Sequence, residues 1–193
     1  MAQRTLLFDL DGTLWDSYPW YAEALGRSGA ASANRVLARL RRGESVMGIA
    51  SALGVSRTRH IFLCRAAGDC LHLYPNVTAT LDRLVERDCK LGLVSNLSRS
   101  LVHDAFVTIG LSDYFGAALF AAKKPSPSGI LRALSKLGAV PSADVYLVGD
   151  TEADAAAAHA AGVRFAWAKY GYGMAAPANT HRTVSCFEEV LDL

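Results

Sequence analysis

The chain has 193 residues, of which 51% are hydrophobic and 20% are charged, and its formal net charge is +2. This length allows one full core with a small accessory unit, since domains usually hold about 100 to 150 residues, and the composition excludes wholesale disorder and a coiled coil. Lysine and arginine are scattered along the chain and form no long basic run. The sequence therefore indicates no nucleic-acid partner and no membrane-surface partner.

The cysteines form no CxxC pair, and we find neither a signal peptide nor an apolar stretch long enough to cross a membrane. These features favour a reduced, cytoplasmic protein. A zinc cluster is an alternative for one crowded segment, formed by His60, Cys64, Cys70 and His72. The spacing of these residues fits no common zinc finger, and apolar residues separate them. The sequence leaves monomer and homodimer equally open.

The predicted elements alternate between buried strands and amphipathic helices. Short apolar runs predict the strands, and apolar residues at intervals of three and four predict the helices. In chain order these are strand Thr5–Phe8, helix Val77–Arg87, strand Lys90–Val94, helix Ser100–Ile109, strand Ala117–Phe120, helix Ser128–Leu137, strand Val145–Val148, helix Glu152–Ala161 and strand Val163–Trp167. This alternation predicts an α/β fold with a parallel sheet and helices on both of its faces.

The stretch from Trp15 to about His72 interrupts this alternation. It is helical in pattern, rich in alanine, arginine and leucine, and contains no convincing strand. We therefore predict an inserted all-helical cap over residues 15–74. The core domain would then consist of two parts of the chain, residues 1–14 and 75–193.

Asp9 and Asp11 follow the first predicted strand and are the most informative residues of the sequence. Two carboxylates one residue apart can divide two tasks, because one can attack phosphorus or bind a metal ion while the other transfers the proton of the leaving group. Gly12 permits a tight turn directly after them. Such a pair also occurs in ordinary loop caps and turns, so its interpretation depends on further sites.

Three further groups follow later predicted strands, whose carboxyl ends meet at one edge of a parallel sheet. Ser95 and Asn96 can donate hydrogen bonds to phosphate oxygens, although they also suit a helix N-cap. Lys124 lies in a proline-containing loop, where a fixed cation can offset carboxylate and phosphate charge, unless it is an ordinary surface lysine. Asp150 and Asp154 suit a hard cation such as Mg²⁺, although acids are also common at helix N-termini.

In this order, the four groups resemble the motifs of the haloacid dehalogenase superfamily, in its phosphoglycolate-phosphatase-like branch. The resemblance covers essentially the whole chain. It implies a Rossmann-like core with a small helical cap of the C1 type inserted after the first motif. The motifs are Asp9-Leu10-Asp11-Gly12-Thr13, then Ser95-Asn96, then Lys124-Pro125-Ser126-Pro127, and finally Gly149-Asp150 with Asp154.

The resemblance further implies a Mg²⁺-dependent phosphatase that acts on a small phosphorylated metabolite through an aspartyl phosphate. Asp9 would be the nucleophile, Asp11 the general acid and base, and Lys124, chosen over Lys123 because a proline follows it, the stabilising cation. The implied phosphate-binding residues are Gly12, Thr13, Ser95, Asn96 and Lys124. The implied metal-binding residues are Asp9, Asp11 through its backbone carbonyl, and Asp150, with Asp154 behind them or bound through a water molecule.

The four motifs are compatible with some other activities of the same family and disfavour others. A phosphomutase of the β-phosphoglucomutase type stays an alternative, because it shares all four motifs and the cap. A dehalogenase or a phosphonate hydrolase is disfavoured, because neither needs an acid at the position of Asp11. A non-catalytic regulatory protein would have lost a motif residue, and none is lost. Ser95-Asn96-Leu97-Ser98 departs from the Thr-Asn-Lys of dedicated phosphoglycolate phosphatases, so the substrate stays open.

Arg41 and Arg42 are the candidate specificity residues of the cap. They precede Gly43, which marks a turn between two helical patterns, and by resemblance such a turn faces the catalytic cleft. Arginine suits bidentate contacts with a carboxylate or a second phosphate on the leaving group. The alternative is that both arginines complement a helix C-terminus in solvent.

Overall fold

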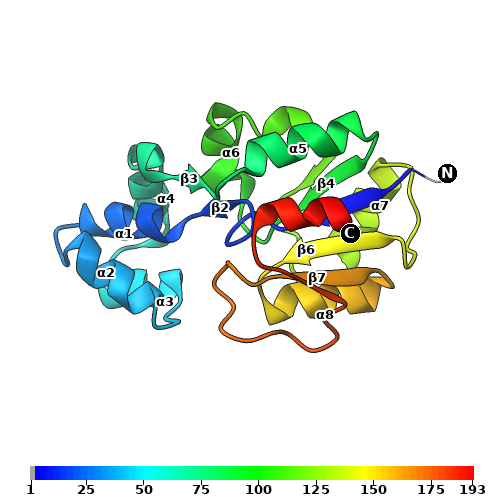
Figure 1. The fold of residues 1–193 in the computed structure, drawn as a ribbon. Helices are drawn as coiled ribbons and strands as arrows, with labels where there is room; N and C mark the ends of the chain where they lie inside the picture. The colour runs from blue at the N-terminus through cyan, green and yellow to red at the C-terminus, as the bar shows by residue number, and fades with distance from the viewer. Residues whose placement is uncertain (1–2) are drawn as a thin grey trace.

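A computed structural model describes residues 3–193, and its centre is a six-stranded sheet (Figure 1). The strand order is β5-β4-β1-β6-β7-β8, and every neighbouring pair is parallel. The predicted parallel α/β fold is confirmed. The strands are β1 (Thr5–Phe8), β4 (Lys90–Val94), β5 (Ala117–Leu119), β6 (Val145–Gly149), β7 (Arg164–Ala168) and β8 (Arg182–Val184).

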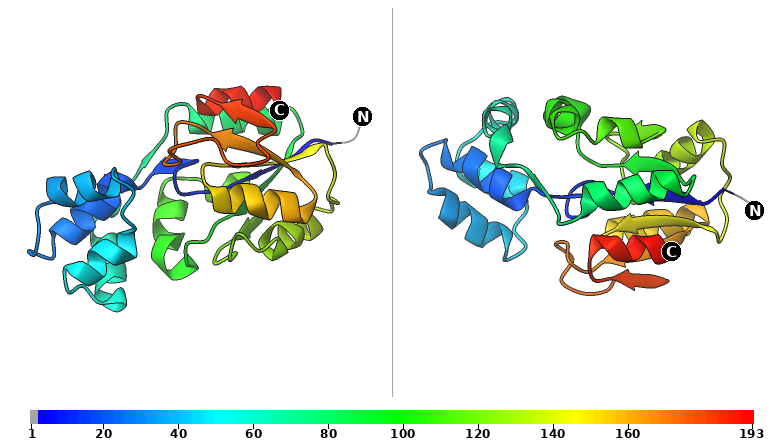
Figure 2. Two further views of the ribbon diagram at one scale, coloured as in Figure 1. Left: turned by 90° about the horizontal axis from the view of Figure 1, so that it is seen from below. Right: turned by 45° about the horizontal axis from the view of Figure 1, so that its top comes forward.

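The central strands are buried on both faces, which explains their continuous apolar runs. Successive side chains of a strand point to opposite faces, so Leu6 and Phe8 pack into one core cluster and Leu7 into the other. Helices cover both faces (Figures 1 and 2). The first face carries α5 (Val77–Glu86), α6 (Arg99–Thr108) and the 3-10 helix Phe187–Asp192, and the second carries α7 (Ser128–Lys136) and α8 (Glu152–Ala161).

Strand β1 lies where the strand order reverses. The chain adds β4 and β5 on one side of β1 and then returns to add β6, β7 and β8 on the other. Open parallel sheets bind ligands outside the carboxyl ends of their strands at such a reversal. Asp9, Ser95 and Asp150 directly follow β1, β4 and β6. The topology therefore brings three of the predicted motifs to one edge of the sheet.

Four helices between β1 and α5 lie beyond this edge, apart from the sheet (Figures 1 and 2). Ser32, Ser45 and Ser56 cap three of them, because each serine side chain accepts a hydrogen bond from the backbone N–H three residues later. None of the helices in residues 3–193 is both long and apolar enough to cross a membrane. The four helices are α1 (Tyr18–Gly26), α2 (Ala33–Leu40), α3 (Val46–Ala52) and α4 (Arg57–Ala66).

The structure contains strands that the sequence did not predict. A two-stranded antiparallel ribbon, formed by β2 (Trp15–Asp16) and β3 (His72–Leu73), joins the four helices to the core. Two residues are too few to produce an alternating pattern. In β8 only Val184 is buried, so this edge strand has no apolar run either. The four predicted core helices begin and end within one residue of α5, α6, α7 and α8.

Candidate active site

Asp9, Lys124 and Asp154 form a buried ion cluster at the carboxyl edge of the sheet. Lys124 Nζ lies 2.6 Å from Asp9 Oδ1 and also contacts Asp154 Oδ1. The exposed fractions are 7% for Lys124, 6% for Asp9 and 0% for Asp154. Lys123 is exposed to solvent. The lysine that faces the predicted nucleophile is therefore Lys124.

Asp150 joins Asp9 and Asp154 in a group of carboxylates that could hold a metal ion. One oxygen from each lies within 4.8 Å of the others, and this is the one such group of His, Cys, Asp or Glu side chains found in residues 3–193. Asp150 Oδ2 accepts a hydrogen bond of 2.7 Å from the Tyr172 backbone N–H, whereas the buried Asp150 Oδ1 has no hydrogen-bond partner. A buried, unpartnered carboxylate oxygen is costly unless a cation binds it. An all-oxygen ligand set of this kind fits Mg²⁺.

The residues of the zinc alternative do not come together in the same way. His60 and Cys64 touch inside α4, with Cys64 Sγ 3.6 Å from His60 Nε2, but Cys70 and His72 lie beyond the end of that helix. Burial raises the pKa of the Cys64 thiol to about 12. Because the thiolate is the form that binds zinc, this environment disfavours a metal at Cys64.

Burial makes the carboxyl groups at the sheet edge harder to ionise. The pKa of Asp9 rises to about 7 and that of Asp150 to about 8; burial is the largest cause, neighbouring carboxylates contribute to both increases, and Lys124 opposes the shift of Asp9. Burial alone would lower the pKa of the Lys124 ammonium, but the charges of Asp9 and Asp154 outweigh it and raise that pKa. A divalent cation at this edge would favour the ionised form of each carboxyl.

Asp11 is held by residues at the start of the four-helix region. Ser17 Oγ donates a hydrogen bond to Asp11 Oδ1, and the Tyr21 hydroxyl lies 3.5 Å from Asp11 Oδ2. Burial raises the pKa of Asp11 to about 6, although both donors oppose this shift. A carboxyl group with a pKa close to neutral is present in both protonation states, which suits a group that gives a proton and later takes one.

Asn96 fixes the loop that carries Lys124. The Lys124 backbone N–H donates to Asn96 Oδ1 at 2.7 Å, and Asn96 Nδ2 donates to the Lys124 carbonyl oxygen at 3.1 Å. Ser95 is buried, and its Oγ accepts a hydrogen bond from the Leu97 backbone N–H at 3.2 Å. The second predicted motif therefore positions the third by direct hydrogen bonds.

Two glycines allow the turn after β1 to approach Asp150. Gly12 has a φ of +79°, and a Cβ at this position would lie 2.8 Å from Asp150 Cγ. A Cβ at Gly171 would lie 2.9 Å from the same atom. Thr13, next to Gly12, is fully buried, and its hydroxyl has no hydrogen-bond partner among the described residues. A buried hydroxyl without a partner at this edge fits contact with a ligand oxygen.

The sequence matches the haloacid dehalogenase-like hydrolases over residues 3–162. The chain belongs to this family. Two relatives of this hydrolase are phosphoglycolate phosphatases. The one from Yersinia pestis is 32% identical over 194 residues, which cover 89% of this chain and 83% of the relative. The one from Vibrio cholerae is 32% identical over 200 residues, which cover 90% and 88%. The hydrolase thus lies in the phosphoglycolate-phosphatase-like branch and is a phosphatase, as the motifs predict.

Solved structures share the fold of this hydrolase. A predicted phosphoglycolate phosphatase from Haemophilus somnus superimposes with a TM-score of 0.74 at 24% identity, over 100% of this chain and 98% of the other. A subfamily IA hydrolase of the superfamily from Geobacter sulfurreducens gives 0.74 at 22% identity, over 99% and 96%. At these identities the likeness shows the fold alone.

Three residues that contact predicted site residues of the hydrolase were not predicted from the sequence. Ser17 and Tyr21 contact Asp11, and Tyr172 holds Asp150. Serine and tyrosine at these positions form no motif with Asp11, so only the fold reveals the contacts. The tyrosine between Gly171 and Gly173 was the one available signal, since paired glycines suggest close backbone approach.

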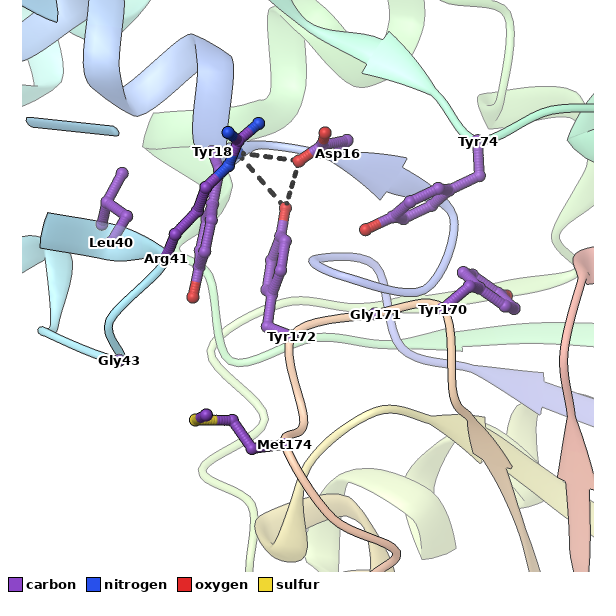
Figure 3. A pocket seen from close by; sticks show the side chains of 10 residues that line it. All are labelled: Asp16, Tyr18, Leu40, Arg41, Gly43, Tyr74, Tyr170, Gly171, Tyr172 and Met174. Carbon is purple, nitrogen blue, oxygen red and sulfur yellow. Dashed lines mark hydrogen bonds between the residues drawn. The ribbon is translucent and has the colours of Figure 1, made fainter. Parts of the chain in front are cut away.

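Neither predicted cap arginine lines the cavity that includes Asp11. Arg41 is exposed and lines a cavity of ≈ 280 Å³ with Asp16, Tyr18 and Tyr172 (Figure 3), and Asp11 is not part of that lining. We call this space the tyrosine-lined cavity. Arg42 is exposed. The structure therefore brings Arg41 to the boundary between α1, α2 and the loop after β7.

Proposed function

We propose that this phosphatase hydrolyses the phosphate ester of a small metabolite through an aspartyl phosphate on Asp9, with Mg²⁺ as its cofactor. The observation that carries the proposal is the buried contact of Lys124 with Asp9, beside an Asp150 oxygen that has no protein partner. An anionic nucleophile approaches an anionic phosphate only where positive charge is fixed nearby. Phosphoryl transfer depends mainly on such positioning and neutralisation.

In the proposed reaction, a carboxylate oxygen of Asp9 attacks phosphorus, and the ester oxygen leaves with a proton from Asp11. Asp11 then takes a proton from the water molecule that hydrolyses the aspartyl phosphate. Ser17 and Tyr21 keep the Asp11 carboxyl in place for both transfers. Lys124 offsets the negative charge of Asp9 and of the transferred group.

Asp9, Asp150 and the backbone carbonyl of Asp11 would hold Mg²⁺, which supplies further positive charge to the phosphate oxygens. Asp154 contacts Lys124 with one oxygen and accepts hydrogen bonds from Thr151 with the other. It therefore positions the lysine, and we propose that any contact with the metal runs through water.

The phosphate would lie against the turn after β1 and the end of β4. Its proposed hydrogen-bond donors are the unpartnered Thr13 hydroxyl, the Gly12 backbone, the Ser95 hydroxyl and the Lys124 ammonium group. The side-chain amide of Asn96 already bonds the Lys124 backbone, so we propose that Asn96 acts mainly by holding that loop. Phosphoglycolate, named in the relatives, is the first substrate to test.

We propose that residues 15–74 act as a cap over this edge, on the core formed by residues 1–14 and 75–193. Arg41 and Arg42 stay candidate specificity residues of that cap. Because Arg41 lines the tyrosine-lined cavity, its contact with a leaving group would require the substrate to extend into that space.

The test is phosphate release from a panel of phosphorylated metabolites in Mg²⁺, in Ca²⁺ and in EDTA. We expect activity with Mg²⁺, little with Ca²⁺ and none with EDTA, because Mg²⁺ keeps near-octahedral geometry whereas Ca²⁺ accepts more ligands and could occupy both Asp9 oxygens. Asp9→Asn, which removes the nucleophile, should be inactive. Full activity in Ca²⁺ or without metal would overturn the metal assignment, and an isomerised sugar phosphate would indicate a mutase.

A further inference from the structure

A cavity of ≈ 500 Å³ opens beside Asp11, between the four-helix region and the core. Tyr21, His60 and Arg57 line it from one side, and Asn96 lines it from the other. We call it the leaving-group cavity, because its wall includes the candidate proton donor. Its volume falls in the range of about 300 to 1,000 Å³ that is usual for pockets that hold drug-sized ligands. The two carbons of glycolate would fill a small part of it.

Apolar side chains form much of the wall of the leaving-group cavity. Val46 and Met47 come from α3, Ile61 from α4, and Leu97 and Leu101 from the segment after β4. Met47 is 48% exposed although it is apolar. Apolar side chains that stay open to solvent in a concave site are typical of ligand contact. This wall favours a leaving group with a carbon skeleton of some length.

Arg57, the first residue of α4, is the one lysine or arginine in this lining. Three arginines of residues 15–74 pair with acids, namely Arg27 with Glu23, Arg39 with Glu44 and Arg65 with Asp104, whereas Arg35, Arg41, Arg42 and Arg59 appear in no ion pair but do not line this cavity. Among residues 3–193, Arg57 appears in no ion pair. The N-terminus of α4 adds partial positive charge at the same place. The leaving-group cavity thus has an acid at one position, an unpaired cation at another and an apolar wall.

We propose that Arg57 binds an anionic group of the leaving group while the apolar wall holds its carbon skeleton. The preferred substrate is then a phosphate monoester whose leaving group is longer than glycolate and carries a negative charge at the end remote from the ester oxygen. This inference rests on the proposed phosphatase function. It leaves the roles of Asp11 and the motif residues unchanged, and it assigns contact with the remote anionic group to Arg57 in the leaving-group cavity.

Three phosphate monoesters test the proposal: phosphoglycolate, phosphooxyhexanoate, which carries a carboxylate at the far end of its chain, and hexyl phosphate, which lacks it. For the wild type we expect kcat/KM on phosphooxyhexanoate to exceed that on each of the others by about 10- to 100-fold, the range of a hydrogen bond to a charged group. In Arg57→Gln the ratio of phosphooxyhexanoate to hexyl phosphate should fall close to one.

Arg59→Gln is the matched control, because Arg59 lies on the same helix, is exposed and does not line the leaving-group cavity. It should keep the wild-type ratio. A preference for phosphoglycolate, an unchanged ratio in Arg57→Gln, or an equal loss of the ratio in Arg59→Gln would overturn the proposal. Hydrolysis of p-nitrophenyl phosphate distinguishes failure of the proposed phosphatase function from failure of the Arg57 proposal. If the protein does not hydrolyse it in Mg²⁺, both fail. If it does, but shows no preference for phosphooxyhexanoate, only the Arg57 proposal fails.

Discussion

The contacts of Asp11 differ from those of Asp9, although one residue separates them. Asp9 contacts Lys124 at the sheet edge, whereas Asp11 accepts its hydrogen bonds from Ser17 and Tyr21. Lys124 lowers the pKa of Asp9 against the effect of burial and so favours the charged form that a nucleophile needs, whereas Ser17 and Tyr21 fix the position of the Asp11 carboxyl group. The two carboxyl groups thus have different contact partners, as two separate tasks require.

The Asp11→Asn variant tests this division. We expect kcat on alkyl phosphates to fall by about 10²- to 10⁴-fold, the usual contribution of general acid–base catalysis. On p-nitrophenyl phosphate the loss should be smaller, because its leaving group departs without a proton. Steady-state kinetics on both substrates give the comparison. An equal relative loss on the two substrates would contradict the acid role of Asp11.

The loop after β7 connects the core to α1 through one tyrosine. The Tyr172 backbone N–H bonds Asp150, and its hydroxyl accepts a hydrogen bond from the Ser17 N–H at 2.6 Å and donates one to Asp16 Oδ1 at 2.9 Å. Its ring stacks on Tyr18 with centroids 3.7 Å apart (Figure 3). The position of α1 is therefore tied to the same loop that orients the candidate metal ligand Asp150.

Replacing Tyr172 with phenylalanine should weaken this connection without removing the stacked ring. The Ser17 N–H, which belongs to a fully buried residue, would lose an acceptor, so we expect the free energy of unfolding to fall by about 1 to 3 kcal/mol. Tyr114→Phe is the control, because the Tyr114 hydroxyl bonds Asp82 in an exposed setting. Urea unfolding measures the free energy of unfolding of both variants. If both lose the same amount, the buried hydrogen bonds of Tyr172 stabilise the protein no more than an exposed one does.

When no metal is bound, the buried carboxyl groups make the free energy of unfolding of the whole molecule depend on pH. The pKa values of Asp11, Asp9 and Asp150 rise from an ordinary 3.8 to about 6, 7 and 8, with burial as the largest cause. Because the folded state binds these protons more tightly than the unfolded chain, the stability they contribute is fully present below the ordinary value and is lost as the pH rises through 6 to 8.

In EDTA, the free energy of unfolding should therefore decrease between about pH 5.5 and pH 8, and Mg²⁺ should raise the melting temperature more at the higher pH, where protons compete less with the metal. Thermal unfolding with EDTA or Mg²⁺ at both pH values measures this. Asp150→Asn should flatten the decrease and reduce the Mg²⁺ effect. A larger gain from Mg²⁺ at the lower pH would contradict the interpretation.

Much of the core was predictable from local sequence. The central strands are buried on both faces, so each leaves a continuous apolar run, and α5, α6, α7 and α8 bury one side and keep the spacing of a helix. Asp9, Ser95, Lys124 and Asp150 stand in loops next to such elements. Their convergence follows from the rule that the carboxyl ends of parallel strands share one edge.

The remaining features depended on tertiary structure. The β2–β3 ribbon is too short for any pattern, and β8 is mostly exposed at the sheet edge. The contacts of Tyr172 with Ser17 and the common cavity of Asp11 and Arg57 join residues far apart in the chain. Local sequence records which residues prefer burial and which geometry the backbone prefers. Which hydroxyl contacts which carboxyl group, and which arginine lines the cavity beside Asp11, is decided only when distant segments pack together.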